Sequence, residues 1–434
     1  MKKTFATLML LITLGLAPGE VFAARLYMAG YEWRVPSYEE NNGGTTATST
    51  VRANGGTISR VVSSIAATSQ KSGLTHIVQG GAIPEGYMRV YVNVDILQAS
   101  ANTYIGIGDS NGGTGYIGFV KLYDNAGSLA LDVFNDKGGT QITDTATVSY
   151  DTWHMIEIYR KANNVAGSDI LTVRVDGVQV ATASNLTYTD APNAQPYAGV
   201  YNDGGTLDST SVVYFDDVAV NDITGTAQNS WPGAGKIALA LPNAAGFVAC
   251  NLGSFSSINE VPPSNNSTGA SDRCEIQTNG GITPMFNVTN STTLGIDSFD
   301  IITVVAPLAR MIKATSLAAN YFMVISANGS ATTSGTSTDL PFASGVLTNS
   351  TGAASFTNNL FSYTNPSTGV AWTPTGTNSI DSMQIGIGST DANPDVYIIT
   401  LAAMVEYRDV ILPLGPLYYS VGKLILTNGK MAII

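Results

Sequence analysis

Charged residues are scarce in this chain of 434 residues: Asp, Glu, Lys and Arg together make up 12% of it. A chain with so few charges does not have the composition of a helical bundle or a coiled coil. Its 20 basic and 32 acidic residues give a net charge of −12. This charge repels phosphate backbones and anionic lipid, and no basic patch offsets it. We therefore expect no nucleic-acid partner.

Histidine and cysteine are also rare, with two of each. His76 and His154 are too far apart in sequence to form a helical metal motif, and there is no Cys-rich ligand set, so zinc chemistry is disfavoured. The two cysteines, Cys250 and Cys274, can close one loop in an oxidising compartment, and an even count in an exported chain favours this disulfide. The alternative is two buried thiols that pack as small hydrophobic side chains.

Hydrophobic residues, at 44%, and 45 glycines are abundant, together with Ser, Thr and Asn. Short runs such as Tyr87–Leu97, Trp153–Tyr159 and Leu171–Val175 are rich in β-branched and aromatic residues and alternate as strands do. The dipeptide Asp176-Gly177 between two valines is a strong hairpin signal. The pattern predicts an all-β protein with two β-sandwich (jelly-roll) domains in tandem.

The first residues have the pattern of a signal peptide. Lys2 and Lys3 precede an apolar run from Leu8 to Leu16, and a small-residue cleavage site follows near Ala23. The run is too short for a membrane span of about 20 residues, although a retained anchor helix is the alternative. We therefore predict a signal peptide over residues 1–23, an exported protein and no membrane span after its removal.

Turn-rich, mostly polar sequence near residues 221–235 marks a domain boundary. We predict a first jelly roll over residues 24–224, a second β-sandwich domain over 225–410 and an apolar C-terminal strand or tail over 411–434. In the second half we expect strands at Lys236–Leu241, Phe299–Val305, Tyr321–Ile325 and Val396–Met404, and a short helix around Ala306–Ala318. The tail is either a final strand that adds to one of the sheets of its own molecule, or an assembly contact made by strand addition to another molecule.

Three segments, Trp153–Tyr159, Val173–Val180 and Tyr214–Asp222, resemble the concanavalin A-like, laminin-G-like jelly roll. The opening segment Arg25–Trp33 resembles the first strand of versions of this domain in tailed-phage virion proteins, such as tail or decoration proteins. Two further segments are similar to a domain that often follows it there: Asn229–Pro242 and Val370–Pro374. A departure is the export signal, which a virion protein assembled in the cytoplasm does not need.

The resemblance also implies a metal site. If the first and last strands of the jelly roll are neighbours, Glu32 meets Asp216 or Asp217, and their oxygen atoms suit a structural calcium ion. The alternative is that one aspartate faces solvent and the other caps a turn.

The sequence lacks the residue pairs that glycan hydrolysis requires. Glu157 has Met155 and Tyr159 as its alternate neighbours, so it has no acidic partner at strand spacing. His154 has no evident nucleophile partner and is expected to face solvent. We therefore expect no enzymatic activity. Aromatic residues in or beside loops are candidates for packing against a sugar ring, or for ordinary packing: Tyr104, Tyr116, Tyr197 and Tyr201.

Together these observations predict a non-enzymatic, surface-exposed structural or adhesive protein, of virion type or an exported assembly component. Its expected partners are further copies of itself or other surface or virion proteins, with a glycan as a candidate ligand. The alternative is a secreted or envelope carbohydrate-binding, lectin-like protein. In either case the sequence predicts an extracellular location or a place on the virion surface.

Overall fold

The computed structural model describes residues 25–30, 37–42, 45–56, 59–64, 71–76, 85–98, 101–108, 117–136, 141–162, 165, 167–187, 195–202, 211–225, 227–246, 250, 253–259, 273–276, 284–313, 319–327, 339–347, 355–356, 361–388, 396–410, 418–419, 422–427 and 430–433. In these parts the regular structure is antiparallel β-strand, with two short 3-10 turns, η1 (Phe255–Ser257) and η3 (Ile380–Ser382). The prediction of an all-β protein is confirmed. Nowhere in the described ranges is there a helix with the length and apolar character needed to span a membrane.

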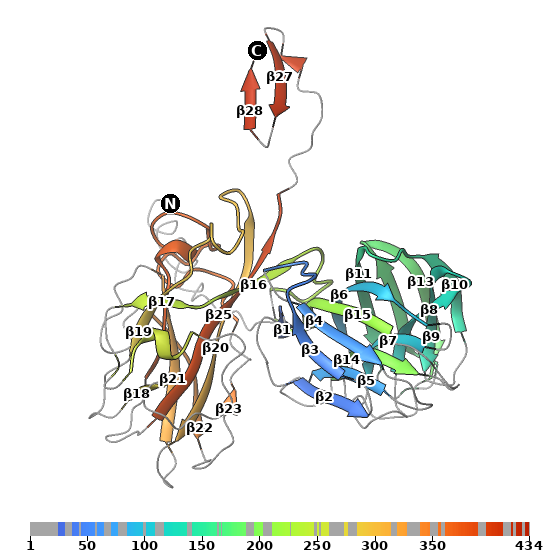
Figure 1. The fold of residues 1–434 in the computed structure, drawn as a ribbon, viewed down its shortest axis with the longest axis horizontal. Coiled ribbons are helices and arrows are strands. Elements are labelled where there is room, and N and C mark those ends of the chain that lie inside the picture. The colour runs from blue at the N-terminus through green and yellow to red at the C-terminus, as the bar shows by residue number, and fades with distance from the viewer. Residues whose placement is uncertain are drawn as a thin grey trace, which may run out of the picture.

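The first half of the chain forms two large sheets, which lie beside the sheets of the second half (Figure 1). One sheet has the order β13-β12-β11-β6-β15-β4-β3, and β1 also pairs with β15. Its strands are β1 (Arg25–Ala29), β3 (Thr45–Ser49), β4 (Ser59–Ser64), β6 (Glu85–Ile96), β11 (Trp153–Lys161), β12 (Asp169–Val175), β13 (Val178–Leu186) and β15 (Ser211–Asp222).

The other sheet of the first half has seven strands in the order β10-β9-β8-β7-β14-β5-β2. Its strands are β2 (Ser37–Asn42), β5 (Lys71–His76), β7 (Ala101–Gly108), β8 (Ile117–Asn125), β9 (Ser128–Asp136), β10 (Gln141–Thr147) and β14 (Gln195–Asn202). Non-consecutive strands are neighbours in both sheets, so the fold depends on pairings between distant parts of the sequence.

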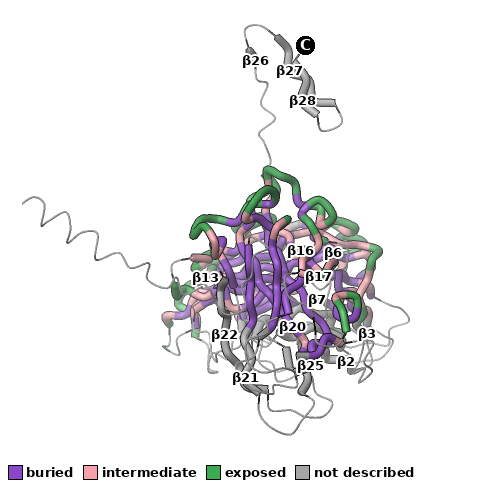
Figure 2. The backbone as a smooth tube through the Cα atoms, turned by 90° about the vertical axis from the view of Figure 1, so that its left-hand side faces the viewer, coloured by how far each residue is buried: buried purple, intermediate pink, exposed green. Residues whose placement is uncertain are grey.

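Strand alternation builds the core between these two sheets. On β6, Val90 and Val92 lie in the core, whereas Arg89 and Tyr91 lie on the opposite face. The facing sheet contributes alternate residues such as Ile105. Figure 2 shows buried residues along the strands and exposed residues gathered in connecting turns. The same alternation leaves each sheet with a second, outer face that points away from this core.

The second half of the chain forms two five-stranded sheets, with the orders β16-β25-β20-β23, to which β18 adds by pairing with β25, and β17-β19-β24-β21-β22. The strands are β16 (Lys236–Ala240), β17 (Pro242–Ala245), β18 (Cys274–Ile276), β19 (Met285–Val288), β20 (Ile301–Lys313), β21 (Ala319–Ser326), β22 (Asp339–Leu347), β23 (Ser355–Phe356), β24 (Gln384–Gly388) and β25 (Val396–Arg408). No sheet of the described strands combines residues from before and after Asp222. The exact position of the domain boundary, predicted at residue 224, stays a prediction.

The helix expected around residues 306–318 is wrong as far as the structure describes that segment, because β20 continues as a strand to Lys313. Ala, Leu and Arg in this stretch favour helix on intrinsic propensity. However, β20 pairs with β25 along its whole length, from Ile301 opposite Arg408 to Lys313 opposite Val396. The ladder of hydrogen bonds with β25 therefore overrides the local preference.

The C-terminal strands β26 (Tyr418–Tyr419), β27 (Gly422–Thr427) and β28 (Lys430–Ile433) form a three-stranded sheet of their own. The alternative in which the tail adds a strand to a sandwich sheet is therefore not seen among the described strands. The assembly contact stays a prediction.

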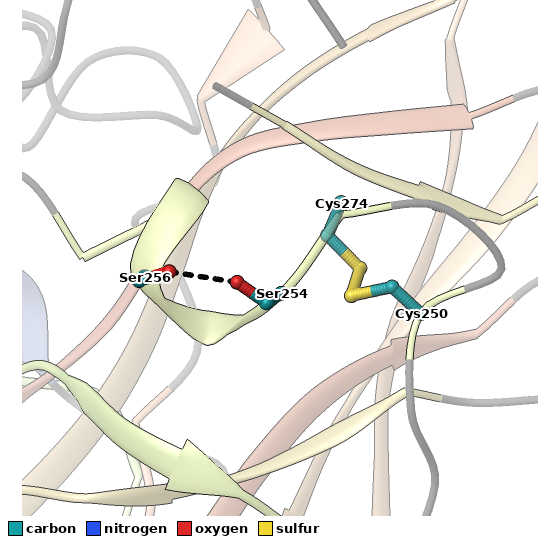
Figure 3. Close-up of a disulfide and its surroundings, with 4 residues drawn as sticks. All are labelled: Cys250, Ser254, Ser256 and Cys274. Atoms are coloured by element: carbon teal, nitrogen blue, oxygen red, sulfur yellow. Dashed lines mark hydrogen bonds between the residues drawn. A yellow bond between two sulfur atoms is a disulfide. The ribbon is translucent and has the colours of Figure 1, made fainter. Parts of the chain in front are cut away.

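The structure joins Cys250 and Cys274 by a disulfide across 24 positions (Figure 3). Cys274 begins β18, a short strand that pairs with β25 beside Ile398. The bond therefore ties the segment before η1 to the edge of a core sheet. A cross-link of this span stabilises a fold by about 3 kcal/mol in the chain-entropy model.

Candidate functional site

The outer face of the seven-stranded sheet is the best candidate for a binding site. Residues of β7, β8 and β9 that point away from the core lie in register across the three strands. One row joins Tyr104, Lys121 and Asp132, and the neighbouring row joins Gly106, Phe119 and Phe134. Strand pairing alone therefore gathers aromatic and charged side chains on one surface.

The aromatic residues of this face touch one another. The ring centroids of Tyr104 and Phe119 are 5.4 Å apart in an edge-to-face arrangement, and those of Phe119 and Phe134 are 5.2 Å apart and stacked. Gly106 makes this possible, because a Cβ there would lie 2.9 Å from the Cβ of Phe119. Tyr104 and Phe119 are buried and Phe134 is partly exposed. The result is an apolar patch apart from the main core.

Polar groups adjoin this aromatic patch. The Lys121 Nζ lies 5.3 Å from the centre of the Tyr123 ring, and the Tyr123 hydroxyl donates a hydrogen bond of 3.3 Å to Asp132 Oδ1. Lys121 and Tyr123 are partly exposed. An apolar ring surface beside an amine, a hydroxyl and a carboxylate is the composition with which proteins bind sugar rings.

Four tyrosines were candidates from the sequence either for sugar contacts or for ordinary packing, and of these Tyr104 lies within this face and is buried. Tyr197 and Tyr201 belong to β14, opposite Gly106 and Asn102 of β7. Tyr116 lies outside the described residues. Sequence reasoning missed Phe119, Lys121, Tyr123, Asp132 and Phe134, because their nearness depends on register between strands. Alternation within β8 and β9 was the signal that could have placed them on one face.

The aspartates predicted as calcium ligands lie at a β-bulge in β15, where it faces the second sandwich. Asp216 Oδ2 accepts hydrogen bonds from the amides of Asn54 (2.8 Å) and Gly55 (3.3 Å), and its Oδ1 accepts one from Asp217 N at 2.9 Å. Asp217 Oδ1 accepts from Ile237 N at 2.7 Å and its Oδ2 from Asn54 Nδ2 at 2.7 Å. All four oxygens thus face N–H donors, an arrangement that does not fit a cation.

The third predicted ligand, Glu32, lies outside the described residues, and no cluster of three or more His, Cys, Asp or Glu side chains suited to a metal occurs in the described parts. Calcium remains a prediction from the resemblance. Because the oxygens of Asp216 and Asp217 already accept N–H groups, we expect thermal melts in excess EDTA and in calcium to superimpose. A rise of several degrees in Tm with calcium would restore the predicted site.

A buried ion network joins the two sandwiches. Glu406 of β25 lies 2.9 Å from Arg25 Nη2 and 2.8 Å from Arg89 Nη2, and all three side chains are fully buried. Thr303 donates a further hydrogen bond of 2.6 Å to Glu406 Oε2. Burial alone raises the pKa of Glu406, but Arg25 and Arg89 outweigh it and hold the pKa at about 2. Glu406 is therefore charged at neutral pH.

Strand β1 reaches both sandwiches. Tyr27 and Ala29 lie in the first core, whereas Met28 packs with Ile237 and Met404 in an apolar cluster on the second sandwich. The pairing of β1 with β15 is irregular between Arg25 and Tyr27. This irregularity accounts for Arg25 facing Glu406 rather than the first core.

The segment before β16 is held on the outer face of the eight-stranded sheet. Trp231 lies 5.2 Å from Tyr87, and the Arg174 guanidinium lies 4.0 Å from the Trp231 ring centre. The amide of Gly233 donates a 2.7 Å hydrogen bond to Glu157. Glu157 therefore anchors this connection, and its expected lack of an acidic partner at i±2 fits that structural role.

His154 has partners that the sequence did not indicate. Its Nδ1 lies 2.8 Å from Asp176 Oδ2, and its Nε2 lies 3.1 Å from Ser149 Oγ. The His154 side chain is 13% exposed, so it is less open to solvent than expected. The other histidine, His76, ends β5 opposite Ser37.

No family model matches this sequence, and no curated protein matches it. Similar solved structures do exist for part of the chain. The endo-β-1,4-glucuronan lyase of the fungus Trichoderma reesei has 18% identity and a TM-score of 0.34, with 42% of this chain and 90% of that chain covered. A GH131 β-glucanase catalytic domain from Podospora anserina has 13% identity and a TM-score of 0.31, over 44% and 87%. The carbohydrate recognition domain of Emp47p has 9% identity and a TM-score of 0.30, over 45% and 97%.

These similarities concern the β-sandwich fold. Two of these three proteins are an enzyme or the catalytic domain of one. The expectation that this chain has no enzymatic activity is contradicted by these findings, because the structures similar to part of the chain include a lyase and a glucanase catalytic domain. The likeness to tailed-phage virion proteins receives no support from these structures and stays a resemblance.

Proposed function

We propose that this chain binds carbohydrate through the outer face of the seven-stranded sheet. The observation that supports the proposal is the aromatic patch of Tyr104, Phe119 and Phe134 beside Lys121 and Tyr123. Sugar rings have apolar C–H faces that pack on aromatic rings, and their hydroxyls bond to amines, phenols and carboxylates. Both kinds of group lie here on three adjacent strands.

The arrangement also suits an extended ligand. The rows run across β7, β8 and β9, and strands in a sheet are about 4.8 Å apart. A chain of sugars lying across the strands therefore meets the partly exposed side chains of this face, which are Lys121 and Tyr123 of β8 and Phe134 of β9. Lys121 places an amine on this face, and an amine can pair with the carboxylate of an acidic sugar, so acidic sugars are included among the expected ligands despite the net charge of −12.

A glycan array on the purified full chain tests the proposal, followed by calorimetry with the best ligand. We expect Phe134→Ala and Lys121→Met each to weaken binding about tenfold, because each removes about 1–1.5 kcal/mol of ring packing or polar contact. Phe299→Ala is the matched control: Phe299 is 74% exposed on the second sandwich, and its truncation is expected to leave affinity unchanged. An array without hits, or equal losses in all three variants, would contradict the proposal.

An assembly role is a second candidate. It rests on β26, β27 and β28, which pair with each other and leave β26 and β28 as edge strands. Edge strands can add to the sheet of a second molecule. Light scattering on the full chain and on a chain that ends at Asp409 tests this role. An oligomer that forms with the full chain but not with the shortened chain supports it. A strict monomer for both chains counts against it. Residues 1–23 lie outside the described residues, and the export predicted from them stays a prediction.

A further inference from the structure

Two turns meet at one end of the first sandwich and bring three polar side chains into a line. Ser149 lies just before β11, His154 is the second residue of β11, and Asp176 lies in the turn between β12 and β13. Asp176 and Gly177 have φ values of +50° and +79°, which the tight hairpin requires. The pairing of β11 with β12 then carries the Asp176 turn to the start of β11.

The contacts have the order hydroxyl, imidazole, carboxylate. Ser149 Oγ lies 3.1 Å from His154 Nε2, and His154 Nδ1 lies 2.8 Å from Asp176 Oδ2. Asp176 is itself fixed, because its Oδ1 accepts a 2.8 Å hydrogen bond from Met155 N. A nucleophile within reach of a base, with the base oriented by a third group, is the geometry by which Ser-His-Asp sites are recognised.

The contacts also determine which imidazole nitrogen carries the proton. A carboxylate can only accept, so neutral His154 donates from Nδ1 to Asp176. Nε2 is then an acceptor, and the Ser149 amide confirms this by donating to it at 3.0 Å. This is the tautomer that a general base needs in order to take a proton from a serine hydroxyl.

The Ser149 hydroxyl is not needed to hold the turn. The amide of Ser149 already ties the turn to Nε2, and Asp151 N bonds to Val94 O at 2.9 Å. Ser149 is exposed, so an incoming substrate can reach its Oγ. The hydroxyl is thus a second contact of Ser149 with the same imidazole nitrogen, beside the amide that holds the turn.

We propose that Ser149, His154 and Asp176 form a nucleophilic site that cleaves carboxylic esters with a good leaving group. Ser149 Oγ bonds to the ester carbonyl carbon while its proton passes to His154 Nε2. The carbon–oxygen bond to the alcohol then breaks, and the departing oxygen takes that proton. Water attacks the acyl-serine by the same route, which releases the carboxylic acid and restores the Ser149 hydroxyl.

The chemistry limits the substrate class. When Nε2 takes a proton, the Ser149 amide loses its acceptor, so each turnover breaks one hydrogen bond. An amide substrate with its poor leaving group is therefore not expected to react. An activated aryl ester is expected to react slowly. Because Ser149 is exposed, esters with a large acyl or alcohol group are also expected substrates.

Two experiments on the full chain test the site. One is labelling with a fluorophosphonate probe, with the labelled peptide mapped by mass spectrometry. The other is hydrolysis of nitrophenyl acetate. We expect the label on Ser149, and a loss of at least about 100-fold in labelling and hydrolysis in Ser149→Ala and His154→Gln. Ser149→Ala keeps the amide contact, so its Tm is expected to stay within about 1 °C of the wild-type value.

Ser128→Ala is the control for another exposed serine, at the start of β9, and is expected to label and hydrolyse as the wild type does. The proposal is overturned if the probe does not modify Ser149, or if Ser149→Ala hydrolyses the ester at the wild-type rate. Glycan binding is measured separately on the same variants, so failure of this site and failure of the proposed function are distinguishable.

Discussion

Glu406→Gln is expected to destabilise the protein by about 3–5 kcal/mol, because it leaves two buried guanidinium groups without their carboxylate. Arg25 and Arg89 both point at Glu406 from the first sandwich, and neither is accessible to water that would solvate the unpaired charge. The free energy of unfolding from urea titrations measures the loss. Since Arg25 and Arg89 come from the first sandwich and Glu406 from the second, we also expect the two halves to unfold in separate steps in the variant.

The control for this variant is Asp409→Asn. Asp409 lies 2.8 Å from Lys236, but these side chains are 50% and 34% exposed. Exposed pairs contribute about 0–1 kcal/mol, so Asp409→Asn is expected to have little effect. Equal losses in Asp409→Asn and Glu406→Gln would mean that burial of the network is not what stabilises the junction.

The effect of Glu406 depends on pH in a defined direction. Its pKa is about 2 in the folded protein and 4.5 ordinarily, so the unfolded chain binds its proton more readily. The stabilisation is therefore fully present above pH 4.5 and is lost as the pH falls toward 2. The difference between wild type and Glu406→Gln is expected to be largest near neutral pH and to shrink below pH 4.5.

The contribution of Asp217 to stability has the opposite pH dependence. Burial raises its pKa to about 6, despite the lowering effect of Arg89 and of the hydrogen bonds from Asn54 and Ile237. The folded protein thus holds this proton more tightly, and Asp217 makes the fold more stable as the pH falls from 6 toward 4. The Glu406 carboxylate itself adds to the rise in the Asp217 pKa, so the difference between the wild type and Glu406→Gln also contains the change at Asp217.

Gly55→Ala is expected to destabilise the protein by about 3 kcal/mol through overpacking at the same junction. A Cβ on Gly55 would lie 2.7 Å from Asp217 Oδ1, 2.8 Å from Ile237 N and 3.0 Å from Ile237 O. Two of these atoms are backbone atoms of β16, which cannot move without disturbing its pairing with β25. The clash also opposes the hydrogen bond from Ile237 N to Asp217.

The matched control is Gly167→Ala. Gly167 has a φ of +75° and nothing within 4 Å of an added Cβ, so its substitution has only the conformational penalty of about 1 kcal/mol. Thermal unfolding followed by calorimetry compares the variants. If Gly55→Ala loses no more stability than Gly167→Ala, the close contact between the two sandwiches at Gly55 is not a constraint on the fold.

The fold class was predictable from sequence because alternation of apolar and polar residues is a local property. The runs Tyr87–Leu97, Trp153–Tyr159 and Leu171–Val175 correspond to β6, β11 and β12, and the Asp176-Gly177 hairpin forms where expected. The described part of the segment Ala306–Ala318, which ends at Lys313, was misassigned because its helix propensity is local, whereas its pairing with β25 is not. The order of strands in a sheet has no local signal at all.

The candidate sites show the same difference between local patterns, which the sequence contains, and contacts between distant strands, which it does not. Tyr104 could be suggested from its place beside a loop, but its contact with Phe119 needed the register of β7 with β8. His154 was expected to face solvent without an evident nucleophile partner. Its contact with Asp176, 22 positions away, arises only through the hairpin between β12 and β13. Ser149 was not considered as a partner, although only 5 positions separate it from His154.

By itself, the sequence determined which residues form strands and which face of each strand is apolar, because side-chain alternation and turn chemistry act between neighbours along the chain. The tertiary structure decided which charges are paired. Arg25 and Glu406 are 381 positions apart, and their attraction matters only when two sandwiches exclude water around them. Burial of that kind arises from the packing of the whole fold, and no local pattern contains it.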